Sequence, residues 1–287
     1  ARLVSSAEAG ARGAGTLFLV STPIGNLGDM TYRAVEVLSS AALVIAEDTR
    51  HSRRLLDHYR IATPLRSYHE HNEAKETPKL VERLLAGDSI ALISDAGTPL
   101  ISDPGFRLVT AAIEAGVTVV PVPGASAVMA ALVGSGLPLE RFNFFGFLPR
   151  KGKERAQAIA EIVGSRATVV LYEAPNRVGD TLRDLADAGA TERRAVVARE
   201  LTKKFEEFRR GSVSELAAVY KDVDPKGEVV LIIAGAAEKT LDDEDLRAAA
   251  AELRVAGKSS RDVMEHLIGA LGAARNTAYK IAHESGS

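Results

Sequence analysis

The sequence has no cysteine among its 287 residues. That absence excludes disulfides, cysteine-ligated zinc, iron–sulfur clusters and a thiol nucleophile. It also fits the reducing cytoplasm, which is the compartment we expect. No apolar run reaches the ~18 residues of a membrane-spanning helix, because Pro and Gly interrupt the longest ones, so no contact with a membrane is predicted.

The sequence also lacks a large excess of either positive or negative charge. The chain has 36 Lys and Arg against 38 Asp and Glu, a formal net charge of −2. No attraction of the whole molecule to nucleic acid follows, and any contact with RNA must come from local basic patches. Residues 1–15 are rich in Ala, Gly and Ser and lack a long apolar region. We therefore expect a flexible tail there and not a signal peptide.

The signatures of phosphate-binding loops are missing too. Neither G-x-x-x-x-G-K-[ST] nor G-x-G-x-x-G occurs. Loops rich in Gly and Pro nevertheless follow the predicted strands, where open α/β sheets bind ligands. They carry Asp29, Asp95 and Asp103 and no Lys, which favours a cationic cofactor over a phosphate-bearing one. Asp in a loop is also commonly a turn former or a helix cap. The four loops are residues 22–29, 94–105, 121–127 and 172–177.

Short apolar runs alternate with helical segments, a pattern typical of a mainly parallel sheet. The length predicts about two domains. Strands are expected at residues 17–20, 43–46, 90–93 and 117–122, then at 142–145, 168–172, 195–198 and 229–234. Helices are expected at residues 31–40, 50–59, 79–86, 106–115, 125–133, 154–163 and 177–188.

After Ala236 the composition changes to helical segments alone. They are expected at residues 241–256, 261–270 and 274–283, and Ser259 to Asp262 has the pattern of a helix start. The predicted fold class is therefore α/β, with two α/β domains and a small C-terminal helical appendage. The predicted division is a tail at 1–15, an N-terminal α/β domain at 16–122, a second α/β domain at 123–238 and a helical domain at 239–287.

Six segments of this chain resemble one known family. They are VSTPIGNLGD at 20–29, EDTR at 47–50, YHEHN at 68–72, SDAGTPLISDPG at 94–105, PGASA at 123–127 and LYEAPNR at 171–177. The family is ribosomal RNA small subunit methyltransferase I, a branch of the tetrapyrrole methylases, and the resemblance runs from about Leu17 to the end of the chain. It implies a tetrapyrrole-methylase fold with S-adenosylmethionine (SAM) in a cleft between the two α/β domains.

The resemblance also implies an activity and partners. These are 2′-O-methylation of a cytidine ribose in the decoding region of 16S rRNA, within the small ribosomal subunit, and a homodimer. One position departs from the wider superfamily, which often has Gly-Asp-Pro where this chain has Gly-Thr-Pro at 97–99. The residues that the resemblance places at the cofactor are Pro23, Asp95, Gly97, Thr98, Pro99, Ser102, Asp103, Gly105, Ser126, Ala127, Tyr172, Leu201, Lys226 and Gly227.

A ribose hydroxyl is a poor nucleophile until its proton is removed or shared, so a carboxylate or another base is expected near the loops. We favour Asp103 and Glu200, with Arg199 or Lys203 stabilising the developing alkoxide. Two alternatives stay open: Asp48 with Arg50, and Glu200 with Lys203 or Lys204, are also spaced as ordinary ion pairs. The full set of candidates is Asp29, Glu47, Asp48, His69, Asp103, Glu173 and Glu200.

Metal is not required by this chemistry, and none is predicted, because the helical H-x-x-x-H spacing is absent around His69 and His71. Basic residues beside exposed aromatic rings suit single-stranded RNA. Phe142 and Phe144 alternate as in a strand, which indicates core positions for those rings. The predicted RNA contacts are Arg50, Arg53, Arg54, Arg150, Lys151, Lys153, Arg177 and Lys204.

Two rival functions remain at this point. One is a small-molecule methylase that acts on a carbon of a tetrapyrrole, since that fold is shared. The other is a module that binds rRNA without chemistry.

Overall fold

The computed structural model describes residues 13–237 and 243–284. The tail predicted at residues 1–15 lies outside the described residues except for its last three. The chain divides into two compact units, and the boundary along the sequence falls between Ala236 and Ala237. The division of the first unit into two domains at residue 122 stays a prediction, although its strands form two separate sheets.

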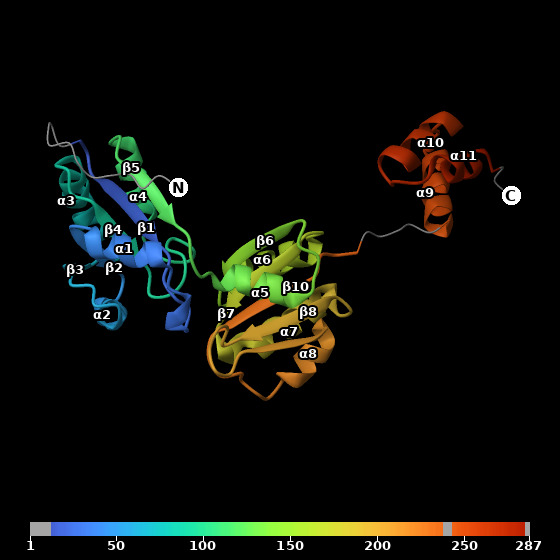
Figure 1. Ribbon diagram of the computed structural model, residues 1–287. Helices are drawn as coiled ribbons and strands as arrows, with labels where there is room; N and C mark the ends of the chain where they lie inside the picture. Colours follow the sequence, from blue (N-terminus) through green and yellow to red (C-terminus); the bar gives the residue numbers. More distant parts are fainter. Residues whose placement is uncertain (1–12, 238–242, 285–287) are drawn as a thin grey trace. The chain divides into compact units, whose positions relative to one another are not determined.

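The first sheet is wholly parallel, with strand order β3-β2-β4-β1-β5 (Figure 1). Its central strands are continuous apolar runs, as expected of a parallel sheet covered on both faces. Four of the five strands were predicted, and the short β3 was not. The strands are β1 (Thr16–Val20), β2 (Leu43–Ala46), β3 (Leu65–Ser67), β4 (Ile90–Ile93) and β5 (Thr118–Val122).

Helices cover both faces of this sheet. Leu38 and Leu56 from α1 and α2 pack on one face, and Leu84 and Leu108 from α3 and α4 pack on the other. Sequence allowed either Asp29 or Thr31 as the cap of α1, and the structure selects Thr31, whose side chain accepts a hydrogen bond from the Ala34 amide. The helices are α1 (Tyr32–Ser40), α2 (Thr49–His58), α3 (Glu73–Leu85) and α4 (Phe106–Glu114), with a 3₁₀ turn at Leu27–Asp29.

Helix α3 begins six residues before its predicted start at Lys79. Proline normally ends a helix, because it lacks an N–H and clashes with the preceding turn. Here Pro78 lies inside the helix. The turns on either side of it bury Thr77, Leu80 and Leu84, and that burial offsets the cost of the proline.

The second sheet has strand order β6-β7-β10-β8-β9. Only β6 and β7 are parallel, and every other pair is antiparallel. The mainly parallel pattern thus fails here, because β8 and β9 are joined by residues 200–206 without a helical crossover and run antiparallel. The strands are β6 (Phe142–Phe147), β7 (Thr168–Glu173), β8 (Arg194–Arg199), β9 (Glu207–Ser212) and β10 (Val229–Ile233).

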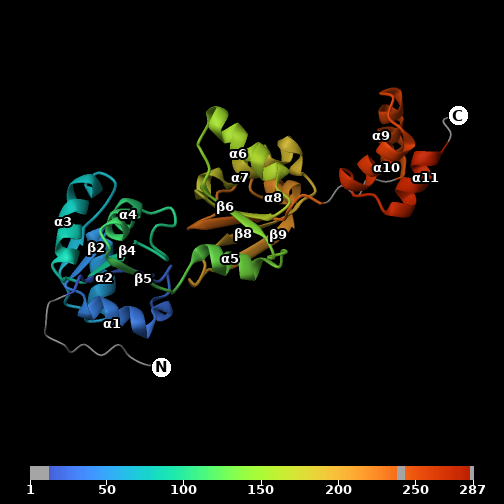
Figure 2. The same ribbon diagram turned by 90° about the horizontal axis from the view of Figure 1, so that it is seen from above.

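The helices of this half are divided unequally between the two faces of the sheet (Figure 2). Helices α6, α7 and α8 cover one face, and α5 packs on the other. Strand β9 and helix α8 were not predicted. The helices are α5 (Ala127–Ser135), α6 (Gly152–Gly164), α7 (Val178–Leu185) and α8 (Val213–Val219), with a 3₁₀ turn at Pro175–Arg177 and a π-helical turn at Ala186–Ala190.

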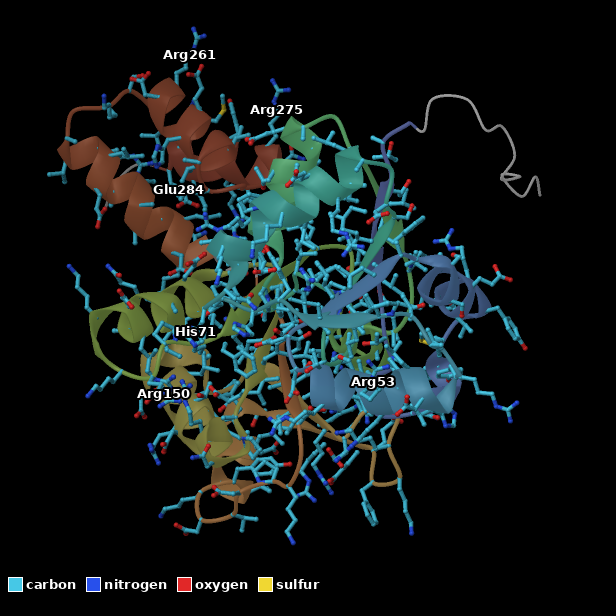
Figure 3. All side chains as sticks on the ribbon, turned by 90° about the vertical axis from the view of Figure 1, so that its left-hand side faces the viewer. Arg53, His71, Arg150, Arg261, Arg275 and Glu284 are labelled. Atoms are coloured by element: carbon cyan, nitrogen blue, oxygen red, sulfur yellow. The ribbon has the colours of Figure 1, made fainter. Side chains whose placement is uncertain are left out.

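The C-terminal unit consists of α9 (Asp243–Val255), α10 (Ser260–Gly269) and α11 (Arg275–His283). Its own small core includes Leu246, Leu267 and Ile281. The predicted start of α10 is confirmed, because Ser259 and Asp262 form a reciprocal capping box. Arg261 and Arg275 belong to α10 and α11 (Figure 3). No helix in the described part of the chain is long and apolar enough to cross a membrane.

Candidate active site

Three loops at the carboxyl ends of β1, β4 and β5 are fastened to one another. Thr22 and Gly97 exchange two backbone hydrogen bonds of 2.9 and 3.0 Å between the first and second loops. The Ser21 hydroxyl lies 3.2 Å from Oγ1 of Thr98, which in turn lies 3.2 Å from the carbonyl oxygen of Ala125 in the third loop. The three loops therefore form one hydrogen-bonded surface.

The loop after β4 holds a strained backbone. Leu100 and Ser102 have φ values of +70° and +68°, in the left-handed region that favours glycine. Each such residue costs on the order of 1–3 kcal/mol, and strain of this kind gathers at binding and catalytic sites. The loop carries Asp103 at its end and leads into α4.

The second sheet supplies an apolar surface. Strand β10 runs antiparallel to β7 and pairs Val229 with Glu173, so the start of β10 lies beside the end of β7. Strand β6 ends next to them at Phe147, after an irregular register. The rings of Phe147 and Tyr172 lie with their centroids 5.4 Å apart.

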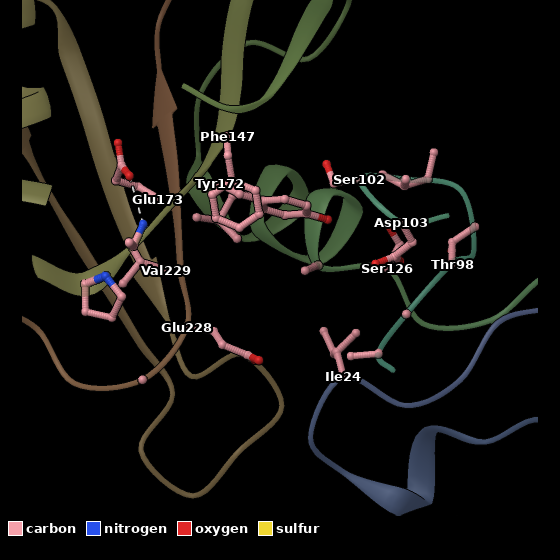
Figure 4. A pocket seen from close by; sticks show the side chains of 18 residues that line it. Ile24, Thr98, Ser102, Asp103, Ser126, Phe147, Tyr172, Glu173, Glu228 and Val229 are labelled. Atoms are coloured by element: carbon pink, nitrogen blue, oxygen red, sulfur yellow. Dashed lines mark hydrogen bonds between the residues drawn. The ribbon is translucent and has the colours of Figure 1, made fainter. Parts of the chain in front are cut away.

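These two surfaces line one pocket of about 280 Å³ (Figure 4). Apolar side chains such as Ile24 and Val230 form much of its wall. No Lys, Arg or His is among the residues that line it. The acids that line it are Asp103, Glu173 and Glu228.

Asp103 differs from the other two acids. Glu173 pairs with Arg177, and Glu228 pairs with Lys203. Asp103 has no ion pair among the described residues. Burial, followed by the negative charge of Glu47, raises the pKa of Asp103 to about 6, against the opposing effect of a hydrogen bond with Ser94. The carboxylate therefore lies in a site that favours a nearby cation.

The phenol of Tyr172 is influenced by the negative charge of Asp103. Burial, together with the charges of Asp103 and Glu228, raises the pKa of Tyr172 to about 12. Its phenol therefore keeps its proton at neutral pH and can serve as a hydrogen-bond donor.

Comparison with known proteins places the chain in a family. The model of the tetrapyrrole (corrin/porphyrin) methylases matches residues 16–217. Ribosomal RNA small subunit methyltransferase I of Synechocystis sp. is 49% identical over 259 residues, which are 88% of this chain and 92% of that protein. The protein of the same name from Micromonospora olivasterospora is 44% identical over 285 residues, which are 98% and 90% of the two chains.

The chain belongs to the ribosomal RNA small subunit methyltransferase I family.

Solved structures of proteins with other names share its fold. Uroporphyrin-III C-methyltransferase from Thermus thermophilus, complexed with S-adenyl homocysteine, is 18% identical, with a TM-score of 0.54 over 77% of this chain and 97% of that one. Diphthine synthase is 17% identical, with a TM-score of 0.56 over 76% and 89% of the two chains. The predicted tetrapyrrole-methylase fold is confirmed.

Eight of the fourteen residues that the family resemblance placed at the cofactor line the pocket. They are Gly97, Thr98, Ser102, Asp103, Ser126, Ala127, Tyr172 and Gly227. The other six are not among the lining residues. They are Pro23, Asp95, Pro99, Gly105, Leu201 and Lys226.

Two of those six have evident structural roles. The Asp95 carboxylate accepts a hydrogen bond of 3.1 Å from the backbone amide of Asp48, and so ties two loops together. Leu201 is buried in the core beneath α5. Cofactor contact by all fourteen residues stays a prediction.

The second group favoured for catalysis forms ion pairs instead of lining the pocket. Nζ of Lys203 lies 2.9 Å from carboxylate oxygens of both Glu200 and Glu228, and Nε of Arg199 lies 2.6 Å from Glu207. The hydrogen bond from Lys203 lowers the pKa of Glu200. This is the ordinary pairing that the sequence left open, and it weighs against Glu200 as the base.

The remaining candidate bases also have local explanations. The Asp48 side chain caps α2 and pairs with Arg50 at 3.1 Å, the alternative that the spacing allowed. Glu173 is buried and accepts a hydrogen bond of 2.6 Å from Thr181. Burial and the charge of Asp95 raise the pKa of Glu47, which does not line the pocket.

Asp29 and His69 lie outside the lining too. Asp29 is exposed. Nδ1 of His69 is buried without a hydrogen-bond partner among the described residues. No group of three or more acidic or histidine side chains in residues 13–237 and 243–284 is placed to hold a metal ion.

Sequence reasoning missed several lining residues, notably Ile24, Phe147 and Glu228. Ile24 lies in one of the four predicted ligand-binding loops, but its apolar side chain gave no chemical reason to select it. Phe147, at the end of β6, was not singled out, and it is 58% exposed. Phe142, expected in the core, is 41% exposed. Glu228 reaches the pocket only because β10 runs antiparallel to β7, which the sequence did not reveal.

The predicted RNA-contacting residues fall on separate elements. Arg53 and Arg54 are exposed on α2, and Arg150 is exposed just before α6 (Figure 3). Lys151, Lys153 and Lys204 are exposed as well. Arg177 differs, because its guanidinium donates to the carbonyl oxygens of Leu148 and Pro149, at 3.0 and 3.1 Å, and pairs with Glu173. That structural use weighs against Arg177 as an RNA contact.

Proposed function

We propose that this protein transfers the methyl group of SAM to the ribose 2′-oxygen of a cytidine in the decoding region of 16S rRNA. The proposal includes a cytoplasmic homodimer that acts on the small ribosomal subunit. The observation that carries it is the pocket of the first unit, whose unpaired acid, Asp103, has a pKa raised to about 6. Membership of the family supplies the rRNA substrate class.

The chemistry of the pocket fits SAM. A cation next to Asp103 is attracted by that carboxylate and by the nearby acids Glu47 and Asp95. The rings of Phe147 and Tyr172 offer apolar surface for an adenine. The N-terminus of α5, capped by Ser126, suits a carboxylate. A nucleotide phosphate would instead meet acids and no lining cation.

Methyl transfer asks little of the protein beyond positioning and proton removal. When bound, SAM supplies an activated methyl group on a sulfonium sulfur. Asp103 accepts the proton of the 2′-hydroxyl as the oxygen–carbon bond forms and the carbon–sulfur bond breaks. A carboxylate with a pKa near 6 is a stronger base than an ordinary Asp, and it is still ionised at neutral pH. The protonated Tyr172 offers a donor beside it.

A basic surface next to the pocket suits the RNA backbone. A cavity of about 800 Å³ shares Phe147 and Ala174 with the cofactor pocket. Its lining holds four arginines and two aspartates, Asp180 and Asp184, which pair with Arg183 and Arg155. Arg150 is exposed. Phosphates bound there would lie beside the reaction centre, and binding would weaken as salt rises.

The test is incubation of the protein with methyl-labelled SAM and either 30S subunits or a tetrapyrrole precursor. We expect label in 16S rRNA, at a ribose that resists alkaline cleavage of its 3′-phosphodiester. Label in the tetrapyrrole alone would replace this function with that of the small-molecule branch. RNA binding without any transfer would favour a non-catalytic module.

Cofactor binding and assembly are tested separately. Titration calorimetry with SAM, in a buffer that contains a metal chelator, should show saturable binding. Helix α5 exposes Met129 and Val133, which are 50% and 69% accessible, and apolar residues of this kind suit a subunit contact. Light scattering should give twice the monomer mass, and a monomer would remove the dimer from the proposal.

A further inference from the structure

A further cavity of the first unit, distinct from the one lined by Arg150 and Arg183, also adjoins the cofactor pocket. It has a volume of about 660 Å³ and lies between α3 and α4. Asp103 lines both this cavity and the cofactor pocket. Any group that reaches Asp103 from the α3–α4 side therefore meets the same carboxylate as the cofactor does.

The proline inside α3 lies at this cavity and removes one backbone donor of the helix there. Residue 78 has no N–H, so the carbonyl oxygen of Ala74 lacks its usual donor four residues later. Ala74 and Pro78 both line the cavity.

An ion pair at the cavity places a carboxylate, which accepts hydrogen bonds, beside a guanidinium, which donates them. Nε of Arg107 lies 3.1 Å from Oε1 of Glu73, and both residues line the cavity. Glu73 is the less exposed partner, at 21% against 56% for the arginine side chain. The terminal nitrogens of Arg107 have no hydrogen-bond partner among the described residues, and so remain available as donors.

An aromatic ring completes the lining. Phe106 is 76% exposed at the start of α4, although it is among the most apolar side chains of the unit. The cavity thus combines an exposed ring, one guanidinium and several acceptors, among them the Glu73 carboxylate. Unpaired nucleobases are recognised by this combination of stacking and edge hydrogen bonds.

We propose that the α3–α4 cavity receives the base of the acceptor cytidine, with its ribose at Asp103. This inference rests on the proposed function and names the acceptor site for it. Cytosine presents an exocyclic amine beside two acceptors, which complements the Glu73–Arg107 pair, whereas uracil presents a carbonyl where cytosine has the amine. The base and the 2′-oxygen are attached to adjacent ribose carbons, so a base in this cavity places that oxygen near the shared carboxylate. The further acids Glu70 and Glu114 make the cavity unsuitable for phosphate.

Methylation kinetics on 30S subunits that carry cytidine or uridine at the target position test this site. Phe106→Ala should raise KM for the cytidine subunits about tenfold, because a stacking partner is lost, and Phe106→Tyr should restore it. Glu73→Gln should reduce the preference for cytidine over uridine about tenfold. The matched control is Ile113→Ala, also on α4 and 60% exposed but outside the cavity lining, which should leave both values unchanged.

SAM affinity, measured by calorimetry in each variant, distinguishes a local effect from misfolding. If Phe106→Ala no longer binds SAM, the site is tested with Phe106→Tyr and Glu73→Gln alone. Wild-type preference for cytidine in Glu73→Gln, with wild-type KM in the Phe106 variants that bind SAM, overturns the site. An equal rise of KM on both kinds of subunit in Glu73→Gln overturns it too, and indicates a basic protein segment in the cavity. Failure of the wild-type protein to methylate 30S subunits refutes the proposed function instead.

Discussion

Two groups of charged side chains were favoured for catalysis, and the structure gives them opposite environments. Around Glu200, each charge has a partner: Lys203 bridges Glu200 and Glu228, and Arg199 binds Glu207. Asp103 has further acids nearby and no ion pair among the described residues. The pKa of Glu200 is lowered, and that of Asp103 is raised to about 6.

The contrast separates a structural carboxylate from a chemically available one. A paired carboxylate is stabilised in its charged form, so it is a weak base. A partly buried carboxylate without a neighbouring cation is stabilised when it binds a proton or a cationic ligand. The strained loop that presents Asp103 fits this difference, because backbone strain is kept where function requires a fixed geometry.

The largest expected effect comes from removing the carboxylate charge at Asp103. Asp103→Asn should lower the rate of methyl transfer by about 10²–10⁴-fold, the usual contribution of a general base. Glu200→Gln is the matched change in the paired group and should cost less than tenfold. Single-turnover rates with saturating SAM measure the effect of each variant. Similar losses of rate in the two variants would contradict the distinction between the unpaired Asp103 and the paired Glu200.

Breaking the paired group should instead affect stability. Lys203→Met removes both ion pairs of that lysine and should lower the free energy of unfolding by about 1 kcal/mol. The neighbouring Lys204→Met is the control, since Lys204 is exposed and makes no ion pair among the described residues. Urea denaturation compares them. Loss of methyl transfer in Lys203→Met without loss of stability would return Lys203 to the catalytic group.

The raised pKa of Asp103 also predicts a pH-dependent stability. The folded protein holds this proton up to about pH 6, whereas the ordinary value is 3.8, so ionisation of Asp103 removes stability as the pH rises from about 4 to about 6. Asp103→Asn should therefore be about 1 kcal/mol more stable than the wild type at pH 8, with a smaller difference at pH 4. Urea denaturation at the two pH values checks this, and a difference that does not change with pH would contradict it.

The smallest effect concerns the strained loop. Ser102→Gly should raise the free energy of unfolding by up to about 1 kcal/mol, because glycine adopts a positive φ without strain. Ser40→Gly, at the exposed end of α1, is the control and should be destabilising. Thermal unfolding compares the two. A destabilised Ser102→Gly would show that the hydroxyl matters more than the backbone there.

Much of the fold could be predicted because the apolar runs are short, continuous and separated by capping residues. The strand at residues 43–46 and the cap at Ser259 follow from local sequence alone. Strand β9 could not be found this way, since its sequence, EFRRGS, is polar and it lies at the edge of its sheet. Helix α3 was shortened because the burial of its flanking turns is a tertiary effect that outweighs Pro78.

The site was predictable to the extent that it lies in the loops. Asp103, Thr98 and Ser126 line the pocket as the motifs implied. The pairing of Glu200 with Lys203 was open from spacing, but the second carboxylate, Glu228, comes from a distant strand. Whether an acid is paired depends on such long-range contacts, and so the sequence could name the candidate bases without choosing among them.

The pH dependence of kcat/KM for methylation of 30S subunits tests the central claim most directly. If free Asp103 must be ionised to accept the proton, kcat/KM of the wild type should fall tenfold per pH unit below about 6 and level off above it. The residual activity of Asp103→Asn should lack this acidic limb. A wild-type profile that is flat from pH 5 to 8, or an unchanged limb in Asp103→Asn, would contradict the assignment of Asp103 as the base.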